Sequence, residues 1–252
     1  MINFSSRSTA VQVPEKDCRS IFKAVIDSCP HLKQIDIDSN TWSLNNSTFN
    51  LLTSSILMAK LTHLNIPTSM EVEPSNLGSL VQGTNLRYLN LSNQGGYIRN
   101  LDIERIAQGC SRLEHFDVPE KKLNREGLTG LVNARGDTLR TLDVCLTENS
   151  HLILPVLAQC EKLEHLTLRS GALRYVGFQH LAKLKNLKSL SINAVYIMPN
   201  NFVKHFSGGS FQSLTSLSLT SHTLTDECLE AVGNACPNLR QLTIEEEKSY
   251  SR

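Results

Sequence analysis

The stretch Leu-Glu-His-Leu-Thr-Leu at residues 163–168 is one copy of a six-residue phrase that recurs along the chain. Its first, fourth and sixth positions are apolar in every copy. The nine copies place these positions at Leu32/Ile35/Ile37, Leu61/Leu64/Ile66, Leu86/Leu89/Leu91, Leu113/Phe116/Val118, Leu139/Leu142/Val144, Leu163/Leu166/Leu168, Leu187/Leu190/Ile192, Leu214/Leu217/Leu219 and Leu239/Leu242/Ile244. Consecutive copies begin 29, 25, 27, 26, 24, 24, 27 and 25 residues apart. This spacing indicates one structural unit used nine times.

The segments between the copies have the periodicity of short helices. Apolar residues recur at helical spacing in four of them, namely 17–29, 102–110, 126–133 and 227–236, the last opened by Thr225 and Asp226. Each unit is therefore a strand, a turn and a helix, and it buries its apolar faces only against its neighbours. The period lies in the leucine-rich-repeat range. We expect an α/β solenoid, a horseshoe of about nine to ten repeats, with a concave parallel sheet and convex helices.

The repeats predict a single solenoid over residues 1–252. The tetrapeptide Val13–Lys16 recurs as Val118–Lys121, which indicates a degenerate N-terminal repeat and its helix at residues 8–31. Nine full repeats then occupy residues 32–247, and residues 248–252 form a tail. The longest interval, 29 residues from Leu32 to Leu61, contains Trp42 and predicts a small insertion on one rim.

Composition narrows the class of protein. Leucine supplies 38 of the 252 residues and aromatic residues only 6%, as expected for many similar aliphatic layers. The net charge of +1 gives no electrostatic case for nucleic-acid binding, and no apolar run is long enough to cross a membrane. Residues 1–13 do not read as a signal peptide, and seven cysteines do not suggest a disulfide framework. We therefore expect a soluble, reduced protein in the cytoplasm or the nucleus.

Four cysteines occupy one equivalent place, three residues before the first leucine of a phrase. These are Cys29, Cys110, Cys160 and Cys236. The other five phrases have Met58, Gly83, Gly136, Leu184 and Phe211 there. A place that accepts Cys, Met, Leu, Phe and Gly is an apolar packing position. None of the four cysteines lies in a neighbouring repeat of another, so we expect no metal site.

This cysteine pattern, together with residues 224–229 (Leu-Thr-Asp-Glu-Cys-Leu) and 236–239 (Cys-Pro-Asn-Leu), resembles the cysteine-containing leucine-rich repeats of F-box/LRR proteins, which are ribonuclease-inhibitor-like solenoids. The resemblance covers about residues 8 to 247. It implies that the solenoid recognises a substrate protein, while a separate helical F-box attaches it to a cullin-based SCF ubiquitin ligase.

The chain departs from that family at its start, because the repeat register begins by about Ser8 and no Leu-Pro-containing box precedes it. Contact with ubiquitin-ligase subunits would then need a missing or separate F-box. Two functions remain: substrate recognition in an F-box/LRR-type ubiquitin-ligase pathway, and a stand-alone scaffold or regulatory binding protein unrelated to ubiquitin.

The concave face is the expected site for a protein partner. Side chains alternate along a strand, so positions three, five and seven of each phrase point away from the core. Position five is carboxylate or amide in the first five phrases and hydroxyl in the last four. Tyr and Arg are common interface anchors. The predicted partner-binding residues are Tyr88, Asn90, His115, Asp117, Asp143, His165 and Arg169. The alternative is that these positions are polar only because they are exposed.

No pattern in the chain predicts catalysis or a cofactor. Phosphate-binding glycine loops, HExxH and GxSxG are absent from the sequence. Asp117 and Asp143 lie in adjacent repeats, but an open, wet surface would not separate their pKa values for acid–base work. His63, His115 and His165 are each two repeats apart, roughly 10 Å, too far to share a zinc ion. We therefore expect a non-catalytic protein-interaction module without metal or cofactor.

Overall fold

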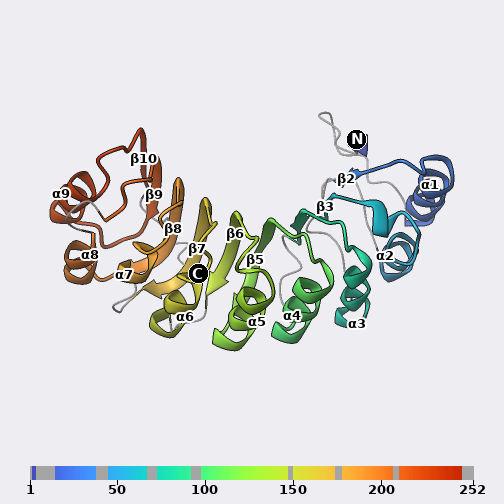
Figure 1. Cartoon of the computed structure of the whole chain (residues 1–252), viewed down its shortest axis with the longest axis horizontal. Coiled ribbons are helices and arrows are strands. Elements are labelled where there is room, and N and C mark those ends of the chain that lie inside the picture. Colours follow the sequence, from blue (N-terminus) through green and yellow to red (C-terminus); the bar gives the residue numbers. More distant parts are fainter. Residues whose placement is uncertain are drawn as a thin grey trace.

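The computed structural model describes residues 2–3, 15–37, 45–66, 73–91, 98–146, 150–173, 178–206 and 210–245. Strands and helices alternate along an arc (Figure 1). The strands lie side by side on the inner side of the arc and the helices form its outer side. The expected α/β leucine-rich-repeat horseshoe, with a concave sheet and convex helices, is confirmed.

One parallel sheet contains all ten described strands, and their order in space is their order in the chain. The strands are β1 (Ile2–Asn3), β2 (Gln34–Asp36), β3 (His63–Asn65), β4 (Tyr88–Asn90), β5 (His115–Leu123), β6 (Thr141–Leu146), β7 (His165–Leu173), β8 (Ser189–Ile197), β9 (Ser216–Thr220) and β10 (Gln241–Glu245). Each begins at position three of its phrase, apart from β1, which precedes the first phrase. The strands of the central repeats are the longest.

A helical segment precedes every strand from β2 onward. The α-helices are α1 (Glu15–Ser28), α2 (Asn46–Thr53), α3 (Pro74–Leu77), α4 (Asn100–Gly109), α5 (Arg125–Arg135), α6 (Ser150–Leu157), α7 (Phe178–Leu181), α8 (Pro199–His205) and α9 (Asp226–Ala235). Two 3-10 helices, η1 (Met58–Lys60) and η2 (Gly78–Gln82), follow α2 and α3. The four helices expected from the sequence correspond to α1, α4, α5 and α9, with bounds that differ by one or two residues.

The core consists of stacked leucine layers between the sheet and the helices. Positions one, four and six of the first eight phrases are buried, and Leu64, Leu89 and Leu217 are fully inaccessible. Because neighbouring strands pair in the same register, equivalent leucines stack on one another. The cysteine place packs against this core: Cys110, Cys160 and Cys236 are buried, while Cys29 is partly buried.

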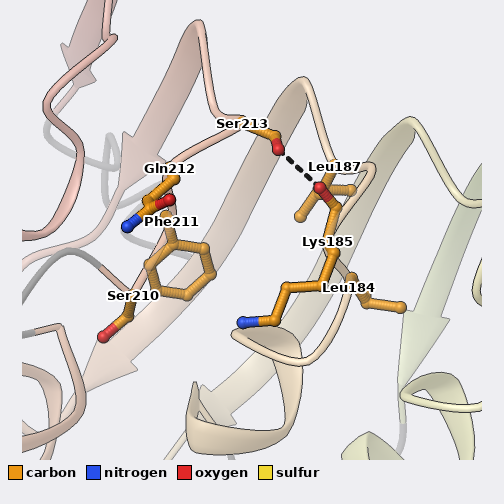
Figure 2. Close-up of a pocket in the computed structure, with 7 residues that line it drawn as sticks. All are labelled: Leu184, Lys185, Leu187, Ser210, Phe211, Gln212 and Ser213. Carbon is orange, nitrogen blue, oxygen red and sulfur yellow. Dashed lines mark hydrogen bonds between the residues drawn. The ribbon is translucent and has the colours of Figure 1, made fainter.

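Side chains just before five of the phrases tie the turn to the preceding repeat. The amides of Asn85, Asn186 and Asn238 donate to the carbonyl oxygens of Ala59, Glu161 and Gln212 at 2.7, 2.8 and 2.8 Å. Thr138 donates to Leu113 O in the same way, and Ser213 donates to Lys185 O (Figure 2). We call these contacts the turn ladder. They supply hydrogen-bond donors to carbonyl groups that the helical segments and turns leave without a backbone partner.

The two ends of the sheet differ from the expected pattern. Residues 8–13, the expected opening repeat, lie outside the described residues, as does Trp42. On the side of β2 away from β3 lies β1, in which Ile2 pairs with Ile35. At the other end Leu242 and Ile244 of β10 are 46% and 44% exposed, although they hold positions four and six. No described repeat follows β10, so these two side chains lack the cover that buries their equivalents.

No helix within the described part of the chain is both long enough and apolar enough to cross a membrane.

Candidate protein-binding surface

Parallel, in-register pairing brings the predicted residues together on the concave face. Tyr88 pairs with His115, Asn90 with Asp117, and Asp117 with Asp143, on strands β4, β5 and β6. Strand β7 adds Arg169 opposite Cys145, and His165 opposite Thr141. All seven predicted residues therefore occupy four adjacent strands. We call this set, Tyr88, Asn90, His115, Asp117, Asp143, His165 and Arg169, the central concave surface.

The first row of this surface is built from rings at position three. Tyr88 stacks on His63 of β3, with ring centroids 4.0 Å apart and planes within 8°. On its other side His115 lies 6.0 Å from Tyr88 and is tilted by 36°. His115 Nδ1 continues the row by a 2.8 Å hydrogen bond with Thr141 Oγ1. His165, next along the row, is exposed. The row places an aromatic wall along the concave face.

The second row consists of carboxylates and an amide at position five. The Tyr88 hydroxyl reaches it, hydrogen-bonding with the Asn90 side chain and donating to the carboxylate of Asp117. Arg169 holds Asp143 with two bonds, Nε to Oδ1 at 3.2 Å and Nη2 to Oδ2 at 3.0 Å. Such a bidentate pair fixes the planes of both groups. The Asp143 charge is thus compensated within the chain.

Asp117 differs from its neighbour Asp143. Burial, then the Asp143 charge, raise the pKa of Asp117 to about 6, while the hydrogen bond from Tyr88 opposes the shift. The expectation of an open, wet carboxylate pair without a separated pKa is therefore wrong for Asp117. The rings and amide around it remove water that an isolated strand residue would keep. Burial also lowers the pKa of His115, which keeps this ring neutral at pH 7.

Three contributors to the surface were not among the predicted binding residues. His63 stacks on Tyr88 and bonds Asp36 Oδ1 through Nε2 at 2.9 Å, and Thr141 bonds His115. The sequence could have indicated them, because His63 and Thr141 hold position three of their phrases and Asp36 holds position five. The short spacing between strands makes a neighbouring ring or hydroxyl a direct contact.

A row of ion pairs borders the surface at position two. Arg87 pairs with Glu114, and Glu164 lies between Arg140 and Lys188. The three basic side chains of these pairs are 47% to 56% exposed to solvent. Exposed pairs contribute little free energy of folding. Their alternating signs leave the border close to neutral, so the excess charge of the concave face lies in the carboxylate row.

The C-terminal part of the concave face carries only small polar groups at positions three and five. Strands β8 and β9 present Ser189, Ser191, Ser216 and Ser218 there. These serines have neither rings nor charges, so they offer a partner little contact area and no ion pair. At positions three and five of the described strands, rings and charged groups therefore lie only on β2 to β7.

A metal site finds no support among the described residues, and one hollow between two turns is small. No group of three or more His, Cys, Asp or Glu residues there is arranged to hold a metal ion. A hollow of about 270 Å³ lies between the turns before β8 and β9, lined by Leu184, Lys185 and Phe211 among others (Figure 2). Ligand pockets are usually larger, about 300–1,000 Å³, and this one lies among turn-ladder residues such as Ser213. We interpret it as a gap between repeats.

Comparisons with known proteins agree with this fold. No protein-family model matches the chain, and no curated protein matches it. Among solved structures, a chain of the yeast Rad7–Elc1 complex is similar at 16% identity and a TM-score of 0.50, covering 91% of this chain and 76% of that chain. An internalin (InlF) of Listeria monocytogenes is similar at 14% identity and a TM-score of 0.38, covering 94% of this chain and 92% of that chain. At 16% identity the likeness to the chain of the Rad7–Elc1 complex concerns the fold alone.

Proposed function

We propose that the chain is a non-catalytic protein-interaction module that captures a protein partner on the central concave surface. The observation that carries this proposal is the continuous pair of rows on β4 to β7, a ring row beside a carboxylate row that ends in the Asp143–Arg169 pair. Tyr and Arg are typical of interface hot spots. The neighbouring serine face of β8 and β9 offers none of these groups.

The hydrogen bonds of the two carboxylates on this surface favour binding over catalysis. Arg169 immobilises Asp143, and the Tyr88 hydroxyl bonds Asp117, so both carboxylates already accept hydrogen bonds within the chain. The raised pKa of Asp117 follows from packing by its neighbours, which also makes it a desolvated contact point for a partner.

Within this role we propose substrate recognition in an F-box/LRR-type SCF ubiquitin-ligase pathway, in the cytoplasm or the nucleus. Two sequence features support this proposal because they resemble the repeats of F-box/LRR proteins. They are the repeat phrases and the cysteines that lie three residues before four of them. The similar yeast structure is a complex of two proteins, Rad7 and Elc1, which agrees with a fold that serves protein assembly. The alternative function is a stand-alone scaffold unrelated to ubiquitin, and the following test distinguishes the two.

The test uses the full chain as bait in cells, with the Tyr88→Ala/Arg169→Ala double variant beside it. We expect the wild-type chain to capture a partner, the double variant to lose it, and the partner's ubiquitination and turnover to fall when the chain is depleted. Retained capture by the double variant would contradict the assignment of the surface. Capture that depends on the surface, with unchanged partner ubiquitination and no association with cullin-ligase subunits, would establish the scaffold alternative.

A further inference from the structure

Asp117 is a carboxylate that lacks a cation within the described part of the chain. The other carboxylates of the same row differ from it: Asp143 on the next strand is neutralised by Arg169, and Asp36 on β2 bonds His63. The hydrogen bond to Asp117 comes from the Tyr88 hydroxyl, a neutral donor. The charged group that shifts the pKa of Asp117 is the Asp143 carboxylate, and no cationic group contributes to the shift. Asp117 thus carries the uncompensated charge of the row.

Among the described residues, the net charge of the concave face in this region is negative. Three carboxylates, Asp36, Asp117 and Asp143, face one guanidinium, Arg169. The ring of His115 beside them is neutral at pH 7 because burial lowers its pKa. A partner group of positive charge is therefore complementary to the face, and one of negative charge would be repelled.

The ring row supplies the second half of a receptor for a basic side chain. The rings of His63, Tyr88 and His115 lie alongside the carboxylates, and the Tyr88 hydroxyl reaches Asp117 itself. Lysine and arginine carry three- or four-carbon stems that pack on apolar surface while the charged end stays with polar groups. A carboxylate at the foot of an aromatic wall fits that shape.

We propose that Asp117 receives the cationic end of a lysine or arginine side chain of the protein partner, with the ring row against the stem of that side chain. This inference rests on the proposed function and specifies the chemistry of the partner. It predicts that the recognised segment is basic at its anchor position, and that the Asp143–Arg169 pair forms the boundary of the subsite.

The desolvation of Asp117 makes this contact sensitive to pH. The pKa of its carboxyl is about 6, so the group is ionised for most molecules at pH 7.5 and protonated for most at pH 5. A bound cation favours the ionised form and lowers this pKa, so affinity falls as pH drops through 6. The charged or titratable groups around Asp117 are Tyr88 on β4, His115 on β5, Asp143 on β6, and His165 and Arg169 on β7.

The experiment selects binders from a displayed library of random peptides on the full chain at pH 7.5. Selected peptides are then measured against the Asp117→Asn, Tyr88→Ala/Arg169→Ala and Asp137→Asn variants. Asp137 lies exposed in the turn after α5 and serves as the matched carboxylate control. Asparagine keeps the hydrogen-bond acceptor for Tyr88, and thermal unfolding of each variant confirms that it is folded.

We expect peptides enriched in lysine or arginine, with affinity at least about tenfold lower for Asp117→Asn, unchanged for Asp137→Asn and weaker at pH 5. Peptides that need Tyr88 and Arg169 but show no basic enrichment, or bind Asp117→Asn equally, would overturn the inference and leave the proposed function in place. If no peptide depends on Tyr88 and Arg169, both are overturned.

Discussion

The concave face of β3 to β7 and that of β8 and β9 share one backbone and differ in their side chains. Both parts are parallel strands paired in the same register, over leucines that are equally buried. The first part presents rings, carboxylates and a guanidinium, and the second presents serines at the same positions. The repeat therefore separates two tasks: inward positions hold the solenoid together in every repeat, and outward positions vary to form a recognition surface in some of them.

The largest expected effect comes from removing the large outward groups. Tyr88→Ala combined with Arg169→Ala should lower the affinity for the captured partner by at least about 100-fold, because hot-spot truncations each cost about 2 kcal/mol or more. Ser191→Ala with Ser218→Ala changes the same kind of position on β8 and β9 and should leave affinity within about threefold. Surface plasmon resonance with the purified partner measures both. Equal losses for the two double variants would remove the distinction between the two parts.

Inward positions should respond alike in both parts. Leu89→Ala on β4 and Leu217→Ala on β9 each open a cavity in a fully buried layer, at a cost of about 2–5 kcal/mol in the free energy of unfolding. Leu242→Ala on β10 should cost markedly less, because that side chain is 46% exposed. Urea unfolding followed by circular dichroism checks the order. A cost for Leu242→Ala as large as that for Leu217→Ala would show that β10 is covered in solution.

The Asp117 carboxyl provides a pH-dependent effect of intermediate size. Its folded pKa of about 6 lies above the usual value near 4 for an unfolded chain, so the folded state binds more protons between these values. This group therefore lowers the free energy of unfolding as pH rises from about 4 to 6. Asp117→Asn should remove that loss and stabilise the protein at pH 7 by about 1–2 kcal/mol, with no gain at pH 4.

The comparison of wild type and Asp117→Asn at several pH values isolates this group from the other carboxylates. Asp137→Asn, in the exposed turn after α5, controls for the change from carboxyl to amide. A difference between wild type and Asp117→Asn that stays constant from pH 4 to 7 would mean that the carboxyl is not desolvated in the folded protein.

The turn ladder should give the smallest effect. Asn186→Ala removes one side-chain bond to Glu161 O at an exposed turn, which we expect to cost about 0.5–1 kcal/mol. Asn85→Ala, in the turn before β4, should lower the free energy of unfolding by a similar amount. Thermal unfolding measures both. Losses above about 2 kcal/mol in the free energy of unfolding would contradict this expectation. They would mean that a single turn hydrogen bond stabilises the stack of repeats about as much as a buried leucine does.

The sequence predicts the sheet well because its signal is periodic. Positions one, four and six are apolar in nine phrases, and parallel pairing follows from the strand–helix alternation. The strand at residues 2–3 could not be found in this way, since it is two residues long and lacks the phrase. Sequence also underestimates strand length: β7 and β8 each run nine residues, beyond the six of the phrase.

The concave surface is predictable in part. Alternation along a strand places Tyr88, Asp117 and Arg169 on one face, and the structure brings them together on adjacent strands. The partial burial of Asp117 was not predictable, because it depends on a ring from the preceding strand and a carboxylate from the next. Such contacts arise across the sheet, between residues about 25 positions apart, and a single repeat contains no trace of them.

Site-specific photo-crosslinking tests the central claim most directly, because it compares position five in the two parts of the concave face. A photoreactive amino acid replaces Thr167 on β7 in one protein and Ser218 on β9 in another, and both are irradiated with the captured partner. We predict a crosslinked partner from position 167 and little or none from position 218. Equal crosslinking from both positions, or crosslinking from position 218 alone, would contradict the assignment of the partner to the central concave surface.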